Sequence, residues 1–157
     1  FVPLDTGPIL DAGCGTGLQA EALRLLGYGP IVGIDFSEQM LNAARAKGIY
    51  SELCRMTLGE TLDFADESFN AVLCSGVLTP GHAPPSTFTE LVRVTRPGAL
   101  VVFALREDQG HLSGHLEAVA GLERAGVWSN VFLSTRYQSM PFGEAEVVHR
   151  VHVYRKT

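Results

Sequence analysis

The segment Ile9–Gly17 constrains the fold more than any other part of the chain. Two apolar residues and Asp11 run directly into the alternating glycines Gly13, Gly15 and Gly17. Such an apolar run is typical of a buried strand, and glycines let the main chain turn sharply and approach a ligand without interfering Cβ atoms. The N–H groups of the helix that follows face the same space. The segment therefore predicts a strand, a turn that binds a nucleotide-like cofactor, and a helix.

Apolar runs and helical periodicity alternate along the rest of the chain. We expect strands at 9–11, 31–35, 51–56, 69–75 and 99–105, helices at 18–26, 38–47, 87–96 and 112–125, and two β-rich runs at 131–139 and 146–155. This alternation favours an open parallel sheet with helices on both faces, and the last two runs predict a hairpin that adds an antiparallel edge strand. The expected fold class is α/β, Rossmann-like and doubly wound, with a mostly parallel sheet.

Local signals place several helix ends. Ser37 can cap the second helix. The spacing of Thr87 and Glu90 is typical of a capping box at the start of the third helix, which is expected to run toward Arg96 before Pro97–Gly98 turns the chain. The apolar positions of the fourth helix predict that Leu116 lies on its inner face.

Length and composition restrict the class of protein. The 157 residues, 46% of them hydrophobic, suit a single domain spanning 1–157, and the net charge of −5 comes without a basic stripe for nucleic acid. No run approaches the roughly 20 apolar residues that cross a bilayer, so we expect a cytoplasmic protein without membrane contact. The chain begins at Phe1 and enters its first strand almost at once, which predicts that N-terminal helices are missing. The sequence contains no pattern that predicts the oligomeric state.

Cys14, Cys54 and Cys74 are widely separated, and each lies in or beside an apolar segment. This is how free cysteines behave as small core residues. We expect neither a disulfide framework nor a metal site.

The charges around the glycines indicate the kind of cofactor. A dinucleotide fingerprint reads G-x-G-x-x-G, whereas the third glycine here comes one residue earlier, at Gly17. Asp11 would repel a pyrophosphate but suits an ammonium group. Asp35 ends the second expected strand, where its two oxygens can accept hydrogen bonds from ribose hydroxyls; a helix cap is its alternative role. This pattern fits S-adenosylmethionine better than NAD.

Four motifs in the same order resemble those of class I S-adenosylmethionine-dependent methyltransferases. They are ILDAGCGTG, VGIDFSEQML, SFNAVLCSGVL and ELVRVTRPGALVVF. Within that class, GIYSELCRMTLG, GVLTPGHAP and LERAGVW are similar to the methyltransferase-like proteins named after the Williams-Beuren syndrome chromosomal region. The resemblance implies a seven-stranded sheet whose last strand is antiparallel.

The resemblance also implies a role for each residue of the cofactor site. Asp11 and Gly13 would lie by the methionine moiety, Gly15 and Gly17 would shape the loop, Asp35 would hold the ribose, Phe36 and Met40 would pack near the adenine, Thr57 and Leu58 would meet the adenine edge, and Ser75 would face the methionine end. Many members carry an acidic residue at the position of Leu58. Adenine recognition here would then rest on main-chain atoms and packing.

No catalytic residue is identified from the sequence, and none is required. The cofactor activates its own methyl group, and orientation alone can contribute roughly 7 to 11 kcal/mol. One hypothesis is a methyltransferase acting on a small-molecule or protein acceptor. A second is a cofactor-binding scaffold without turnover, and a third is an NAD-dependent oxidoreductase. The acceptor itself is not predicted.

The remaining polar and aromatic candidates have weaker signals. His82 could act as a base at the mouth of the substrate pocket, but a solvated loop position is favoured. For His111 and His115 we favour an exposed helix face over a metal site, because no glutamate accompanies them. His149 and His152 should point to opposite faces of a strand. Trp128 is expected to pack a helix onto the sheet rather than line a substrate cavity.

Overall fold

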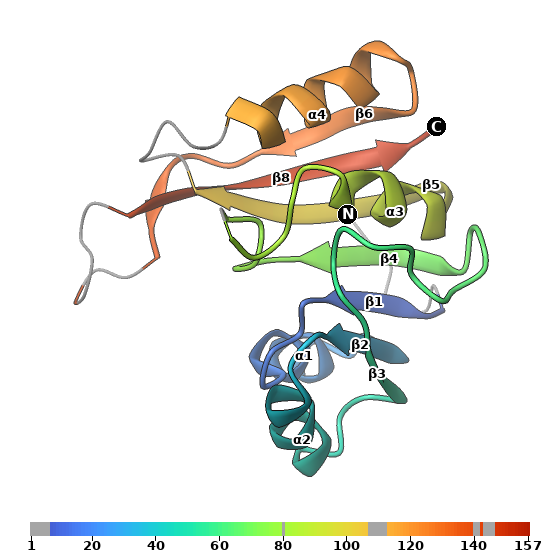
Figure 1. Ribbon diagram of the computed structural model, residues 1–157, viewed down its shortest axis with the longest axis vertical. Helices are drawn as coiled ribbons and strands as arrows, with labels where there is room; N and C mark the ends of the chain where they lie inside the picture. Colours follow the sequence, from blue (N-terminus) through green and yellow to red (C-terminus); the bar gives the residue numbers. More distant parts are fainter. Residues whose placement is uncertain (1–6, 80, 107–112, 140–141, 143–146) are drawn as a thin grey trace.

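In the part of the chain that the structure describes, eight strands form one sheet (Figure 1). The computed structural model describes residues 7–79, 81–106, 113–139, 142 and 147–157. Its strands are β1 (Ile9–Ala12), β2 (Ile31–Asp35), β3 (Glu52–Arg55), β4 (Phe69–Cys74), β5 (Thr95–Arg106), β6 (Trp128–Leu133), β7 (Tyr137–Gln138) and β8 (Val148–Lys156). Its helices are α1 (Leu18–Leu25), α2 (Glu38–Ala46), α3 (Thr87–Val94) and α4 (Ser113–Arg124).

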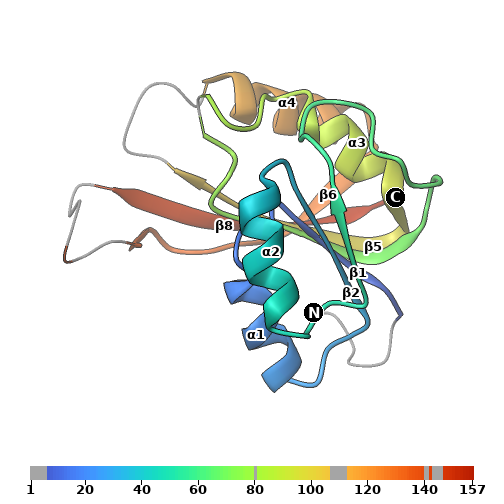
Figure 2. The same ribbon diagram turned by 60° about the horizontal axis from the view of Figure 1, so that its bottom comes forward.

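The sheet order is β3-β2-β1-β4-β5-β8-β6, and β7 pairs with the start of β8. Strands β1 to β5 pair in parallel, whereas β8 is antiparallel to both β5 and β6. Figure 2 shows α1 and α2 on one side of the sheet and α3 and α4 on the other. The predicted α/β, doubly wound, mostly parallel fold is confirmed.

The predicted place of the antiparallel strand is wrong. We expected it at the edge, but β8 lies between β5 and β6, and β6 forms the edge. The first run of the expected hairpin begins at Trp128 and is divided into β6 and the two-residue β7. A sequence pattern indicates that a strand exists, but its neighbours depend on pairing between distant segments.

The junction of α3 and β5 also differs from the prediction. Helix α3 ends at Val94, and β5 already includes Thr95 and the Pro97–Gly98 segment that we expected to form a turn. Thr87 is not a cap, because it lies within the helix and is fully buried, while Ser86 occupies the N-cap position. Thr87 is the first helical residue, so its side chain does not occupy the N-cap position that a capping box requires. Ser37, by contrast, caps α2 as predicted by accepting a hydrogen bond from the Met40 N–H at 3.3 Å.

An aromatic cluster forms part of the core between the sheet and helices α3 and α4. Phe88, Phe103 and Tyr154 surround Trp128, with the Trp128 and Tyr154 ring centroids 4.6 Å apart. Trp128 is 1% exposed, and its Nε1 donates to the Val119 carbonyl of α4 at 3.2 Å. The prediction that Trp128 packs a helix onto the sheet is confirmed.

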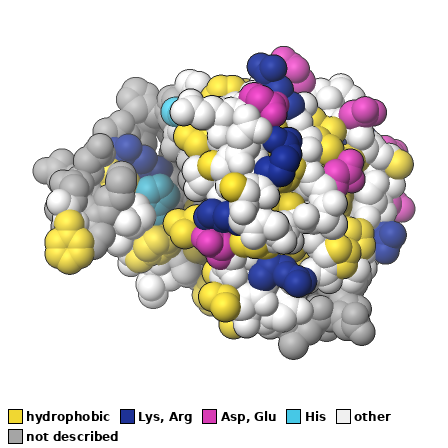
Figure 3. Space-filling model, turned by 90° about the horizontal axis from the view of Figure 1, so that it is seen from below, with side chains coloured by type: hydrophobic (Ala, Val, Ile, Leu, Met, Phe, Trp, Pro, Cys, Tyr) yellow, Lys and Arg dark blue, Asp and Glu magenta, His cyan; other side chains and the backbone are white. Residues whose placement is uncertain are grey.

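Helix α1 directs several leucines outward. The exposed fractions of Leu18, Leu25 and Leu26 are 72%, 88% and 65%. Figure 3 views the molecule from the end formed by α1 and α2, where hydrophobic side chains lie among scattered charged groups of both signs. Within the part of the chain that the structure describes, no helix has the length and hydropathy to cross a bilayer.

Candidate cofactor site

The glycine loop joins β1 to α1 and is held against β2 by main-chain hydrogen bonds. The N–H groups of Gly13 and Cys14 both donate to the Ile34 carbonyl at 2.9 Å. Gly13 has φ +78°, and a Cβ on it would lie 2.8 Å from the side chain of Val77. Gly17, with φ +84°, would bring a Cβ within 2.9 Å of the Tyr50 ring. The loop therefore requires glycine at both positions for its conformation and for its close neighbours.

Asp35 ties the end of β2 to this loop. One of its carboxylate oxygens accepts from the Gly15 N–H and the other from the Ser37 N–H, each at 2.9 Å. The side chain is largely buried, but it also lines a cavity. Since a carboxylate oxygen can accept more than one hydrogen bond, each oxygen keeps capacity for a ligand hydroxyl. Asp35 thus fixes the loop and keeps acceptor capacity at the edge of the cavity.

A cavity of about 280 Å³ lies where the chain leaves the carboxyl ends of these strands. This volume is near the lower end of the range for small-molecule sites, and the position agrees with the rule that open α/β sheets bind ligands beyond the strand ends. The cavity is lined by Gly13, Asp35, Phe36, Met56, Thr57, Leu58, Val77, Gly81, His82 and Ala83. Its lining comes from the segments after β1, β2, β3 and β4.

Half of the predicted cofactor residues meet in this cavity. Gly13, Asp35, Phe36, Thr57 and Leu58 line it. Asp11, Gly15, Gly17, Met40 and Ser75 are not part of its lining.

Each of these five residues has another place in the fold. Asp11 is almost fully buried in β1, Gly15 and Gly17 belong to the loop, Met40 is partly exposed on α2, and Ser75 directly follows β4. Two strand-adjacent residues of the lining were missed. Met56 directly follows β3, and Val77 reaches Gly13 from the segment after β4. The only sequence signal for them was their position just past strand ends.

Asp11 lies beneath the glycine loop rather than in the cavity. It is 1% exposed, and its Oδ2 accepts a hydrogen bond from the Tyr50 hydroxyl at 2.7 Å. Burial raises the pKa of Asp11 to about 6, the Tyr50 bond opposes the rise, and repulsion from Asp35 adds to it. Burial, together with the negative charges of Asp11 and Asp35, raises the pKa of the Cys14 thiol to about 12. Cys14 is therefore a protonated packing residue, not a nucleophile.

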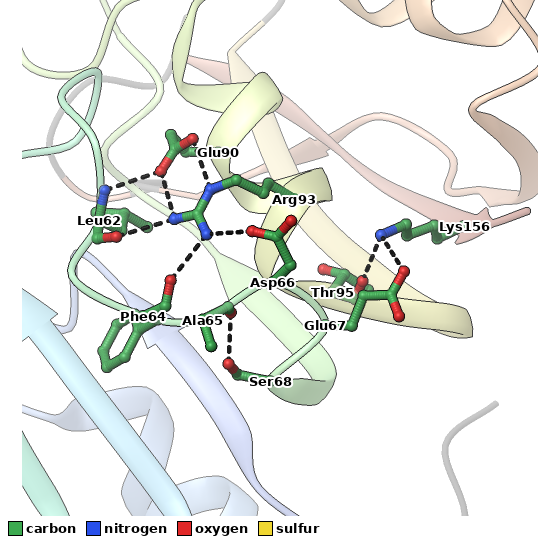
Figure 4. A network of polar contacts seen from close by, with 10 residues as sticks. All are labelled: Leu62, Phe64, Ala65, Asp66, Glu67, Ser68, Glu90, Arg93, Thr95 and Lys156. Atoms are coloured by element: carbon green, nitrogen blue, oxygen red, sulfur yellow. Dashed lines mark hydrogen bonds and ion pairs between the residues drawn. The ribbon is translucent and has the colours of Figure 1, made fainter.

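The segment that follows β3 contributes Thr57 and Leu58 to the cavity wall, and an arginine of α3 holds the continuation of this segment (Figure 4). The Arg93 guanidinium donates to the Leu62 and Phe64 carbonyls, at 2.9 and 2.8 Å, and to the carboxylates of Glu90 and Asp66. Glu90 in turn accepts the Leu62 N–H at 2.8 Å. Its bond with Arg93 lowers the pKa of Glu90. This Arg93 network holds the segment that follows Leu58 in the cavity wall.

The histidines have unlike environments. His82 is exposed, lines the cavity, and has its Nδ1 3.2 Å from the Thr79 hydroxyl. The prediction that His115 lies on an exposed helix face is wrong, because the side chain is 4% exposed and its Nε2 lies 2.9 Å from the Ala83 carbonyl. It shares a buried stripe with Val119, one helical turn on, while Leu116, predicted on the inner face, is 41% exposed. His111 lies outside the described residues.

The two histidines of β8 differ as expected for opposite faces. His152 is 6% exposed and stacks on Phe103, with ring centroids 5.1 Å apart. His149 lies 2.9 Å from the Ser139 hydroxyl. Among residues with described positions, no group of three or more His, Cys, Asp or Glu side chains is arranged to hold a metal ion.

A methyltransferase domain is recognised over residues 10–103. The chain belongs to the S-adenosylmethionine-dependent methyltransferases. This methyltransferase is 41% identical to human methyltransferase-like protein 27 over 133 residues, which cover 82% of this chain and 54% of the relative. It is 34% identical to phosphatidylethanolamine N-methyltransferase of Cereibacter sphaeroides over 144 residues, 86% of this chain and 69% of that protein. The predicted family and its methyl-donor cofactor are confirmed.

Solved structures agree on the fold. A S-adenosylmethionine-dependent methyltransferase from Mesorhizobium loti superposes with a TM-score of 0.70 at 18% identity, covering 99% of this chain and 94% of that one. The [4+2]-cyclase SpnF superposes with a TM-score of 0.75 at 16% identity, covering 99% and 77%. The methyltransferase described here spans about half the length of the human relative.

Proposed function

We propose that this methyltransferase transfers a methyl group from S-adenosylmethionine to a small-molecule or protein acceptor, and that the cavity beyond β1 to β4 holds the donor. The observation that carries the proposal is the convergence of Gly13, Asp35, Phe36, Thr57 and Leu58 on one cavity. These residues come from three separate segments, at the ends of β1, β2 and β3, and together they supply a close main-chain approach, a carboxylate and an apolar surface. That combination fits a nucleoside with a methionine chain.

Each predicted residue receives a role in this proposal. Asp35 accepts the ribose hydroxyls, Phe36, Thr57 and Leu58 surround the adenine, Gly13 lies by the methionine moiety, and Gly15 and Gly17 shape the loop. Asp11 contributes its charge from beneath the loop. Met40 and Ser75 do not line the cavity, and their predicted places beside the adenine and the methionine end rest on the sequence alone.

The donor, when bound, supplies an activated methyl group, so the chain has to bind, orient and exclude water. The loop and Asp35 form the fixed side of the site, and the segment Gly81–Ala83 forms its other side. Among the described residues of the lining, His82 is the one imidazole, and we propose it as the candidate base for an acceptor proton. A general base adds to a rate that orientation already raises, so loss of His82 should slow methyl transfer without abolishing donor binding.

A small-molecule acceptor is favoured by the relatives. A ubiquinone biosynthesis O-methyltransferase of Hahella chejuensis is 35% identical to this chain over 100 residues, and a demethylmenaquinone methyltransferase of Symbiobacterium thermophilum is 34% identical over 97 residues. A cytoplasmic location is a further proposal, supported by the free state of Cys14, Cys54 and Cys74, which suits a reducing compartment.

The donor site is tested by calorimetric titration of S-adenosylmethionine into the wild type, Asp35→Ala and Asp63→Ala. We expect Asp35→Ala to weaken binding more than about tenfold, since a charge-assisted hydrogen bond contributes roughly 1.5 to 3 kcal/mol. Asp63, an exposed aspartate of the loop after β3, is the matched control and should bind as the wild type. Unchanged affinity in Asp35→Ala would overturn the placement of the ribose.

Turnover is a separate question from binding. Release of S-adenosylhomocysteine in the presence of a panel of hydroxyl, amine and thiol acceptors supports the enzyme. Binding without turnover across the panel favours the scaffold, a function that Leu58 in place of an acidic adenine partner leaves open. Tighter binding of NADH than of S-adenosylmethionine would contradict both.

A further inference from the structure

Tyr50 lies beneath the cofactor site, where three main-chain segments approach its side chain. Its hydroxyl donates to the Asp11 carboxylate of β1 at 2.7 Å. A Cβ on Gly17, at the end of the loop, would lie 2.9 Å from its ring, and a Cβ on Gly33 of β2 would lie 2.7 Å from it. Two glycines therefore leave the room that the ring fills, and the ring carries its hydroxyl to Asp11.

The ring and the hydroxyl of Tyr50 do different things. The ring fills space between the loop and the sheet, which phenylalanine could also do. The hydroxyl supplies a hydrogen bond to a carboxylate that is 1% exposed. A buried carboxylate without partners favours its neutral form, and a donated hydrogen bond favours its charged form.

The other groups around Asp11 do not stabilise its charged form. Asp35 of β2 repels its charge, and the thiols of Cys14 in the loop and Cys74 in β4 are the other titratable groups near enough to be affected by it. None of these groups in the described part of the chain is a cation. The Tyr50 bond is the interaction that acts against burial and repulsion and lowers the pKa of Asp11.

We propose that Tyr50 is a positioning residue for donor binding, because its hydroxyl keeps the Asp11 carboxylate charged and fixed beneath the glycine loop. The inference rests on the proposed function of the cavity. S-adenosylmethionine carries a sulfonium and an ammonium group, so a negative charge under the loop that cradles it favours binding. Tyr50 itself is not part of the cavity lining and acts through Asp11.

The test is the pH dependence of S-adenosylmethionine affinity in the wild type and Tyr50→Phe, measured by calorimetry between pH 5.5 and 8.5, a range chosen to span the titration of Asp11 at about 6. Wild-type affinity should fall as the pH drops through about 6 and Asp11 takes up a proton. Loss of the hydroxyl raises the pKa of Asp11, so the fall should begin at higher pH. Binding should then be roughly threefold weaker at pH 6.5 and recover at pH 8.5.

Two controls isolate the hydroxyl. Tyr154→Phe removes a phenol whose partner is Glu123, in the aromatic core away from the loop, and should leave the profile unchanged. The series is repeated in a His82→Asn background, because imidazoles as a class titrate in this pH range. A purely structural Tyr50 would change affinity equally at every pH.

The outcomes separate the two proposals. If the wild type binds no S-adenosylmethionine at any pH, the proposed function fails and the role of Tyr50 fails with it. If the wild type binds and Tyr50→Phe has the same affinities and profile, only the role of Tyr50 is overturned. Asp11→Asn, which removes the titrating group, should lack the fall near pH 6. Should Tyr50→Phe not fold by circular dichroism, a wild-type profile retained in Asp11→Asn overturns the inference.

Discussion

At the scale of single residues, Asp11 shows a conflict between stability and binding. The carboxyl is buried under the glycine loop, and its pKa is about 6 instead of the ordinary value of 3.8. The folded state therefore binds the Asp11 proton more tightly than the unfolded chain does. This favourable contribution is complete below about pH 4 and is lost as the pH rises through about 6. At neutral pH the fold retains a charge that costs it stability.

Asp11→Asn should accordingly stabilise the fold at pH 8 by about 2 kcal/mol, because the amide oxygen can still accept from Tyr50 and no charge is buried. The gain should vanish near pH 4, where the wild-type carboxyl is also neutral. Urea unfolding of the variant and the wild type at pH 8 and pH 4 measures the gain in stability and its loss. A variant that is no more stable than the wild type at pH 8 would contradict the buried charge.

Leu58 is the second residue at which a single change is informative. It lines the cavity, and the family resemblance implies an acidic side chain at this position, facing the adenine amino group in the proposed donor site. Leu58→Asp should tighten S-adenosylmethionine binding by about tenfold, since a hydrogen bond to a charged group contributes roughly 1.5 to 3 kcal/mol before desolvation is subtracted. Leu58→Asn, of the same size without the charge, is the control in the titration. Weaker binding in the aspartate variant would place the adenine elsewhere.

At the scale of elements, the wall after β3 depends on one side chain from α3. Arg93 donates to the carbonyls of Leu62 and Phe64 and pairs with Glu90. Arg93→Ala leaves these acceptors without their donor, so we expect the free energy of unfolding to fall by about 2 to 4 kcal/mol.

Arg96→Ala is the matched control for this element. Arg96 donates to the Glu67 carbonyl and to Asn70 from an exposed position, so its loss should cost less than about 1 kcal/mol. Denaturant unfolding compares the two variants. Equal losses would show that the Arg93 network does not hold the wall.

At the scale of the whole molecule, local patterns predicted the elements but not their neighbours. The apolar runs of β1 and β2 and the Ser37 cap of α2 are short-range signals, and the structure confirms them. The place of β8 depends on pairing of residues 149–155 with residues 100–106, which no local pattern contains.

In the candidate site too, the features that follow from local patterns were predictable, and those that depend on distant contacts were not. Asp35 and Gly13 were predictable because Asp35 ends β2 and Gly13 directly follows β1, and ligands of such sheets lie at the strand ends. The burial of Asp11 under Tyr50 was not, since it arises from contacts 39 positions apart. His115 was misplaced because the helix turns a different stripe to the core from the one that the leucines suggested.

The position of β8 between β5 and β6 has a consequence for biosynthesis. The edge strand β6 leaves the ribosome before β8, yet β8 is the strand to which it is hydrogen-bonded. At roughly 5 to 20 residues per second, the stretch from Leu133 to Val148 takes about one to three seconds to translate. During that interval Trp128 lacks its partner Tyr154, and an apolar strand edge stays open. We therefore expect the nascent chain to expose an unpaired strand edge, which is a hazard for aggregation, until β8 emerges.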